Sequence, residues 1–93
     1  MLLNRDKFIM EQLLETTRAC ELMYLLYEHM DEETEINKQS FLNTLSTMKI
    51  CYEIKYDTSI SLKVEIYLSR YDKDKKYEVI IRDNKVSYIE QKK

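Results

Sequence analysis

The spacing of hydrophobic residues changes near residue 47 and divides the chain into two parts. Up to this point apolar residues recur at three- and four-residue steps, which is the spacing of a helix that buries one face. Beyond it apolar and polar residues alternate, which is the spacing of a strand with one buried side. The pattern therefore predicts a helical first part and a sheet in the second.

The first part predicts a long helix from about Arg5 to Met30. Asn4 is expected to be its N-cap, with Leu3 and Phe8 forming a hydrophobic staple across the cap. The face that we expect to be buried carries Ile9, Leu13, Thr16, Cys20, Met23, Tyr24, Tyr27 and Met30. The polar face that we expect to lie opposite carries Glu11, Glu15, Arg18 and His29.

A second, shorter helix is expected after the connector at residues 31–35. Asn37 suits its N-cap, and Ile36 is placed to form a staple with Phe41. The apolar stripe of this helix continues through Leu42, Leu45 and Met48.

Four strands are expected from residue 48 onward. Their inward rows run from Met48 to Tyr56, from Ile60 to Leu68, from Tyr77 to Ile81, and from Val86 to Tyr88. The expected turns lie at residues 57–59, 72–75 and 83–84. Asp83 and Asn84 suit a two-residue hairpin turn because Asp and Asn tolerate positive φ better than other non-glycine residues.

The expected registers set apolar residues opposite one another on one face of the sheet and opposite charges on the other. The predicted pairs are Tyr52–Val64, Ile54–Leu62, Glu53–Lys63, Leu68–Val79, Glu65–Arg82, Ile81–Val86 and Val79–Tyr88. The predicted fold is α+β: two N-terminal helices, one long and one short, packed on one face of a four-stranded antiparallel β-meander (ααββββ). We expect a single domain over residues 1–93.

Charge is divided in the same way as the hydrophobic pattern. Residues 1–47 hold four basic and nine acidic residues, a net charge of −5, and residues 48–93 hold eleven basic and eight acidic residues, a net charge of +3. The helical part is therefore acidic and the sheet part mildly basic, within a chain of net charge −2.

The amino-acid composition excludes several classes of function. The chain has no glycine, no proline, no tryptophan and one histidine. Phosphate-binding loops, dinucleotide-binding turns and EF-hand loops need glycine, and zinc sites rich in histidine need more than one. We therefore expect no cofactor, no metal and no enzymatic activity. No apolar run approaches the roughly 20 residues of a membrane span, and the charged start does not resemble a secretory signal, so no membrane association is expected.

Two cysteines, Cys20 and Cys51, lie far apart and form no Cys-x-x-Cys motif. We expect both to be reduced thiols, which places the protein in the cytoplasm, or in the host cytoplasm if a phage encodes it. His29 is expected to be solvated or to cap the end of the long helix, where a cation is favoured by the helix dipole.

Eight tyrosines could suggest stacking on nucleic-acid bases. Six of them are expected to face inward: Tyr24, Tyr27, Tyr52, Tyr56, Tyr77 and Tyr88. Tyr67 and Tyr71 are expected on the outer face of the sheet, near Lys63 and Arg82. The pI of about 5.4 argues against nucleic acid as a partner.

Two features of the helical part indicate a protein partner. The stretch from Leu22 to Tyr27 is apolar all round the helix, so Leu22, Leu25 and Leu26 are expected to form an exposed patch that a partner covers. Five acidic residues follow within eight positions and are expected to dock on a basic surface: Glu28, Asp31, Glu32, Glu33 and Glu35. The simpler interpretation of this acidic run is a solvated loop, and loose cation binding is a further alternative.

These features predict a non-enzymatic interaction protein that binds, and inhibits, a larger protein with a basic surface. The chain is small, acidic and rich in tyrosine, and it lacks glycine. In these respects it resembles small phage and mobile-element proteins that block a host factor, anti-CRISPR proteins among them. The alternative is a homodimeric regulatory or antitoxin-like protein that pairs through the long helix, ahead of a nucleic-acid-binding module.

Overall fold

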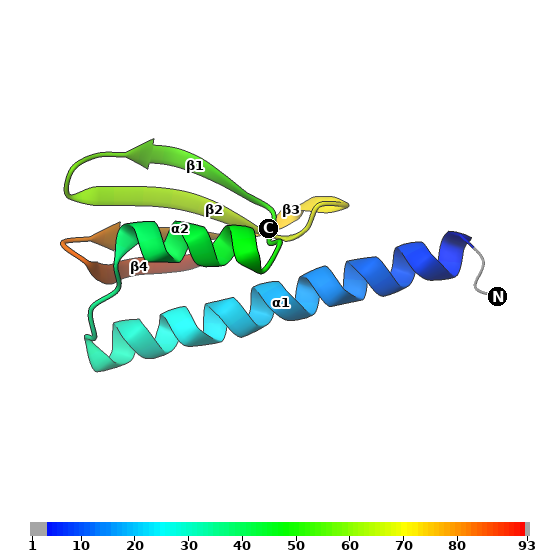
Figure 1. Cartoon of the computed structure of the whole chain (residues 1–93), viewed down its shortest axis with the longest axis horizontal. Coiled ribbons are helices and arrows are strands. Elements are labelled where there is room, and N and C mark those ends of the chain that lie inside the picture. The colour runs from blue at the N-terminus through cyan, green and yellow to red at the C-terminus, as the bar shows by residue number, and fades with distance from the viewer. Residues whose placement is uncertain (1–3, 93) are drawn as a thin grey trace.

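The computed structural model describes residues 4–92. Its elements are α1 (Asn4–Glu32), α2 (Lys38–Thr47), β1 (Tyr52–Asp57), β2 (Ser61–Ser69), β3 (Asp72–Arg82) and β4 (Lys85–Lys92). The strands form one antiparallel sheet in the order β1-β2-β3-β4, and both helices lie on the same side of it (Figure 1). The predicted ααββββ meander is confirmed.

Helix α1 sets the long dimension of the molecule. At about 1.5 Å per residue its 29 residues extend about 43 Å, and the whole molecule measures 49 × 23 × 23 Å. Figure 1 shows the N-terminal part of α1 continuing past the strands, with α2 and the sheet above the rest of the helix. Only part of the helix therefore has the sheet to cover one of its sides.

The start of α2 is as predicted. Asn37 has extended backbone angles, and its side-chain oxygen accepts a hydrogen bond of 2.9 Å from the amide of Ser40. This N-cap satisfies an amide that has no partner inside the helix. The cap predicted for α1, formed by Leu3 and the side chain of Asn4, lies outside the residues whose side chains the structure describes.

Both helices end in a Schellman motif with a non-glycine residue in the left-handed conformation. Glu33 follows α1 with φ 55° and Lys49 follows α2 with φ 56°. The amide of Ile50 then bonds to the carbonyl of Leu45, and the amide of Thr34 to that of His29. Glycine usually occupies this position because a Cβ atom there crowds the backbone.

Replacing Lys49 by glycine is therefore expected to stabilise the protein. Relief of the left-handed strain should raise the free energy of unfolding by about 1 kcal/mol, since Lys49 is exposed and donates no side-chain hydrogen bond that the structure describes. Urea unfolding measures the change. The matched control is Lys49→Ala, which keeps the Cβ atom and should leave stability nearly unaltered; equal effects of the two substitutions would contradict the strain.

The turn between β3 and β4 is also as predicted. Asp83 and Asn84 have φ of 51° and 61°, and the hairpin pairs Ile81 with Val86. Farther from the turn, an irregularity between Ile81 and Ile80 shifts the register. Val79 then pairs with Ile89, so Tyr88 lies opposite Ile80 on the outer face of the sheet, and its predicted inward position is wrong.

The other two predicted registers are wrong by an even number of residues. Tyr52 pairs with Ile66 and Ile54 with Val64, a shift of two from the prediction. Val79 pairs with Val64 instead of Leu68, a shift of four, because the turn lies at residues 70–71 and the predicted turn at 72–75 belongs to β3. Even shifts keep the regularly paired side chains on their predicted face, so the hydrophobic pattern cannot distinguish these registers. Tyr56 is the exception: beyond the irregularity in β1 it pairs with Lys63 on the outer face, so its predicted inward position is wrong.

The core lies between the inner face of the sheet and the two helices. Its fully buried side chains come from both layers: Leu26 from α1, Leu45 from α2, and Leu62, Val64, Ile66, Val79 and Ile81 from the sheet. Among the described strands, β2 contributes most to this cluster, because it is a central strand that lies beneath α1.

Candidate functional site

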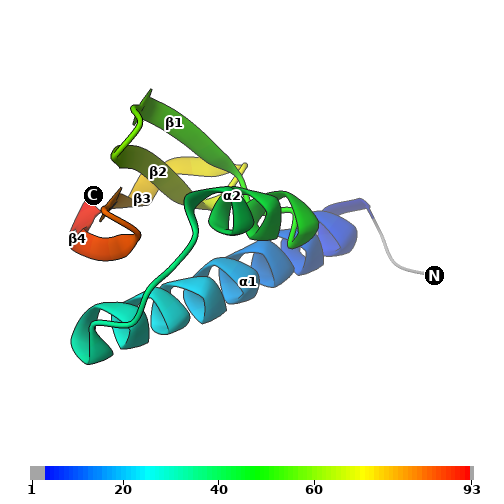
Figure 2. The same ribbon diagram turned by 60° about the vertical axis from the view of Figure 1, so that its left-hand side comes forward.

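The side of α1 that faces away from the sheet carries a continuous set of exposed residues, named here the outer stripe. At 100° per residue its members lie within about 120° of the helix circumference. It consists of Met10, Leu13, Leu14, Thr17, Cys20 and Tyr24. Four of these are large apolar side chains that are between 51% and 66% exposed. In Figures 1 and 2, α2 and the sheet both lie on the other side of α1.

The buried face of α1 differs from the predicted one by about a quarter turn. The structure buries Ala19, Leu22 and Leu26, and it exposes Tyr24 and most of the stripe that was expected to be buried. The stretch after Glu21 is apolar all round, so the pattern alone fits more than one face. Packing selects the face with Ala19, whose small side chain allows the helix to approach the sheet closely.

The predicted leucine patch is therefore wrong for two of its members. Leu22 and Leu26 are 3% and 1% exposed and belong to the core, whereas Leu25 is 50% exposed. All three border a groove of about 190 Å³ between α1 and α2, whose opposite wall includes Ile36 and Phe41. Leu22 and Leu26 thus hold α2 against α1, and Leu25 alone remains available to a partner.

The acidic run is exposed, as the sequence suggested. Its members, Glu28, Asp31, Glu32, Glu33 and Glu35, lie at the C-terminal end of α1 and in the connector to α2. Glu35 pairs with Lys85 through a single β-bridge, and Glu33 borders a depression whose other wall includes Arg82 and Lys85. Basic residues of the β3–β4 turn therefore offset part of the negative charge at this end.

The N-terminal half of α1 is held by the β2–β3 turn. The Nε atom of Arg70 lies 2.6 Å from the Oε1 atom of Glu15, a carboxylate that is 7% exposed. The Tyr71 hydroxyl donates a hydrogen bond of 3.0 Å to Glu11, and its ring contacts Phe8 edge-on, with centroids 4.4 Å apart. Glu15 was expected on the solvent face, and Arg70 provides the partner that makes its burial tolerable.

The candidate reactive groups are one histidine, which has a hydrogen-bond partner, and two free cysteines. The Nδ1 atom of His29 lies 2.7 Å from the hydroxyl oxygen of Thr34, just beyond the end of α1. Both cysteines are free thiols, with Cys20 exposed on the outer stripe and Cys51 half-buried. Within residues 4–92, no three His, Cys, Asp or Glu side chains come together in a way that could hold a metal ion.

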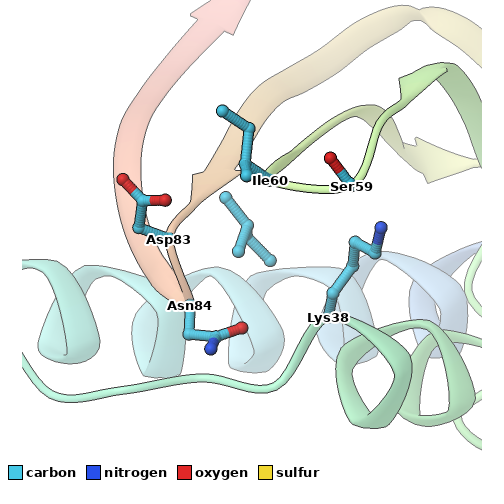
Figure 3. Close-up of a pocket in the computed structure, with 6 residues that line it drawn as sticks. Lys38, Ser59, Ile60, Asp83 and Asn84 are labelled. Atoms are coloured by element: carbon cyan, nitrogen blue, oxygen red, sulfur yellow. The ribbon is translucent and has the colours of Figure 1, made fainter.

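A small polar pocket of about 190 Å³ lies where the start of α2 meets two turns of the sheet. Figure 3 shows Lys38, Ser59, Ile60, Asp83 and Asn84 around it. The Lys38 ammonium already binds the carboxylate of Asp57 at 2.5 Å and the carbonyl of Thr58 at 2.8 Å. This cation therefore joins α2 to the β1–β2 turn and is not free for a ligand.

A row of glutamates crosses the outer face of the sheet. Neighbouring strands pair Glu53 with Glu65, Glu65 with Glu78, and Glu78 with Glu90. These like-charged pairs replace the predicted pairs of opposite charge. Their negative charge is neutralised by lysines of the same strands and of the adjacent strands. Glu65 contacts Lys55 at 3.1 Å and Lys76 at 3.2 Å, and Glu78 contacts Lys63 and Lys92.

The ammonium groups control the ionisation of the two central glutamates. Burial on its own would raise the pKa of Glu65, but hydrogen bonds from Lys55 and Lys76 lower it below its ordinary value of 4.5. A hydrogen bond from Lys63 lowers the pKa of Glu78 in the same way. The lysines of the outer face are therefore occupied by carboxylates, which leaves less positive charge for nucleic-acid phosphates.

This network predicts a loss of stability in acid. Because the pKa values of Glu65 and Glu78 are lower in the folded than in the unfolded chain, the contribution is complete above pH 4.5 and is lost as the pH falls through the folded values. Urea unfolding between pH 6 and pH 3 measures the slope. A Glu65→Gln/Glu78→Gln variant should have a shallower slope, whereas Glu90→Gln, at the exposed end of the row, should not.

The exposure of three tyrosines differs from what the sequence predicted. Tyr67 is 7% exposed, and its hydroxyl donates a hydrogen bond of 2.9 Å to Glu53. Burial, followed by the carboxylates of Glu53 and Glu65, raises the pKa of Tyr67 far above its ordinary value. Tyr24 and Tyr27, which were expected to face inward, are 66% and 37% exposed on α1.

None of the helices in the described part of the chain is long and apolar enough to cross a membrane. Comparison with protein-family models, with curated proteins and with solved structures finds no match to this chain.

Proposed function

We propose that the chain is a non-enzymatic interaction protein and that α1 forms its binding surface. The observation that carries this proposal is the outer stripe, where Met10, Leu13, Leu14 and Tyr24 are each more than half exposed on one side of a helix. Small monomers seldom expose an apolar area of more than about 300–600 Å², and larger areas usually mark a binding site.

The acidic run supports a second contact, with a larger protein that has a basic surface. Its five carboxylates are exposed and lie beyond the C-terminal end of the outer stripe, so the four at positions 31–35 remain accessible when the stripe is covered. Binding there would allow the chain to block its target, as phage and mobile-element inhibitors of host factors do. Opposite charges of this kind mainly raise the rate of association and its salt dependence.

Site-specific photo-crosslinking in the organism that encodes the chain tests the proposed function. A photoreactive phenylalanine analogue in place of Tyr24 should capture a protein that contacts the outer stripe, and mass spectrometry of the adduct identifies it. The same analogue in place of Ile60, which is 56% exposed on the β1–β2 turn, is the control and should capture none. The absence of any adduct at Tyr24 would overturn the proposed function.

Neutralising part of the acidic run should weaken binding to a larger partner without altering the fold. A Glu32→Gln/Glu33→Gln/Glu35→Gln variant removes three exposed carboxylates, so the association rate and its salt dependence should fall while the unfolding midpoint hardly changes. Surface plasmon resonance against the larger partner over a series of salt concentrations measures both. An unchanged association rate would indicate that the acidic run is a solvated connector with no role in binding.

A homodimeric regulatory protein is the second candidate function. The observation that favours it is the distribution of charge along α1, where Arg5 and Lys7 outnumber Asp6 in the first turn and acidic residues predominate in the last turns. Such a helix is complementary to an inverted copy of itself.

A further inference from the structure

We propose that the outer stripe of α1 is covered by a second copy of this chain, whose α1 lies antiparallel across it in a two-fold symmetric dimer. This inference rests on the proposed function, in which the outer stripe is a binding surface, and it names the partner that binds there. Two-fold dimers are the commonest closed assemblies, and they require a surface that is complementary to itself.

The spacing of the exposed residues suits the pairing of two helices. Met10, Thr17 and Tyr24 recur every seven residues, and Leu13, Cys20 and Tyr27 recur every seven residues at an offset of three. All six are exposed, so the structure leaves this seven-residue pattern free along the helix. A repeat of this kind places one seam of side chains against a neighbouring helix over its whole length.

The charges at the two ends of α1 select the antiparallel direction. The first turn carries Arg5 and Lys7 beside Asp6, and the last turns carry Glu28, Asp31 and Glu32. Parallel helices would bring the two acidic ends together and repel one another. Antiparallel helices bring Lys7 close to Glu28 of the second copy, twice in each dimer, and they set the positive end of one helix dipole against the negative end of the other.

The seam pairs large residues at its ends and small residues at its centre. In an antiparallel pair the two seven-residue series face one another. Leu13 then lies opposite Tyr24 of the second copy, and Thr17 lies opposite Cys20. The small central side chains allow the helices to approach closely, and the most exposed apolar residues of the stripe cover one another.

The position of α1 in the fold agrees with this arrangement. The N-terminal part of α1 extends beyond the strands (Figure 1), and Leu13 and Leu14, in the N-terminal half of the helix, are 62% and 52% exposed. An inverted copy lays the C-terminal half of its α1 along this overhanging segment. The seam from Met10 to Tyr27 spans about 26 Å, and a stable interface typically buries about 800 Å² on each partner.

Sedimentation equilibrium tests whether a second copy binds. The wild-type chain should be a dimer at micromolar concentration, and Leu13→Asp should raise its dissociation constant by about 100-fold or more, since each dimer contains the substitution twice. The matched control is Ile60→Asp, an exposed isoleucine on the β1–β2 turn that should leave dimerisation unchanged. Circular dichroism should show both variants folded, because both replaced side chains are more than half exposed.

Cross-linking tests the direction of the helices. In a Cys20→Ser/Cys51→Ser background, Leu13→Cys and Tyr24→Cys chains should form a disulfide-linked dimer only when the two are mixed under mild oxidation. In an antiparallel pair two copies of residue 13 lie about 16 Å apart along the axis, too far for a disulfide. Cross-linking of either variant by itself would show parallel helices and overturn the proposed arrangement.

The outcomes separate this inference from the proposed function. A wild-type chain that stays monomeric up to high micromolar concentration overturns the dimer. If photo-crosslinking at Tyr24 then captures a different protein, the outer stripe remains a binding surface and only the identity of its partner is wrong. If it captures nothing, the proposed function fails with the dimer. An adduct of twice the mass of the chain supports both.

Discussion

Replacing Leu22 by glutamate is expected to unfold the protein. Leu22 is 3% exposed and contacts the core between α1, α2 and the sheet. Removing a buried leucine side chain costs about 2–5 kcal/mol, and burying an unpaired carboxylate adds to this cost. Small domains have a total stability of about 5–15 kcal/mol, so the variant should lose most or all of it. Circular dichroism and urea unfolding measure the loss.

Leu25→Glu is the matched control, because it introduces the same side chain three residues further along the same helix. Leu25 is 50% exposed at the edge of the groove between α1 and α2. Its substitution should change the free energy of unfolding by about 1 kcal/mol or less. If Leu22→Glu folded as well as Leu25→Glu does, Leu22 would not belong to the core, and the rotation of α1 described above would be wrong.

Replacing Ile66 by alanine should lower the free energy of unfolding by about 2–5 kcal/mol. Ile66 lies on central strand β2 with no exposed surface, directly opposite Tyr52 on β1 and Tyr77 on β3. The neighbouring strands are fixed by the sheet hydrogen bonds, and the helices are held by the rest of the core. They therefore cannot close the space that the side chain leaves. Urea unfolding at neutral pH gives the value.

Ile60→Ala removes the same atoms from an exposed position and should cost less than about 0.5 kcal/mol. A similar loss for both isoleucines would indicate that Ile66 is accessible to water. The comparison also tests the register, because a shift of β2 by one residue would move Ile66 to the outer face of the sheet.

The elements and their order could be predicted because each leaves a local signal. Asn37 indicates the start of α2, and Asp83 and Asn84 indicate the last turn. The registers left no such signal. An alternating strand looks the same after a shift of two or four residues, and the pairs of opposite charge that chose the predicted registers are absent, because lysines neutralise the glutamate row from adjacent positions instead.

The face of α1 could not be predicted, for a related reason. Because α1 is apolar all round between Leu22 and Tyr27, several of its faces could be buried. Which face is buried depends on how α2 and the sheet pack against the helix. The buried Glu15 misled the prediction further, because its partner Arg70 lies in a turn that was expected elsewhere in the chain. A carboxylate is assigned to solvent by default, and only the tertiary structure reveals the guanidinium that compensates for its burial.

The predicted partner-binding leucines lie on the same helix as the outer stripe, but two of them are on its buried side. The acidic run needed no knowledge of packing, since a charged connector is exposed in almost any fold, and it lies exposed here. The leucine patch did need that knowledge, and two of its three members are core residues. Three residues of the outer stripe, Leu13, Cys20 and Tyr24, were assigned to the core because they follow the helical spacing of the face that was expected to be buried.

The register irregularity in β1 lies at an edge of the sheet, where a strand of another chain would have to add. Pairing along β1 breaks between Ile54 and Tyr56, with the charged Lys55 at the break, so the free edge of this strand is neither straight nor uncharged. A strand from another molecule cannot continue the sheet across such an edge, which is how many native sheets avoid growing into aggregates. Ile54 and Tyr56, both exposed, flank this break, so two apolar side chains at the edge do not continue one regular alternating row.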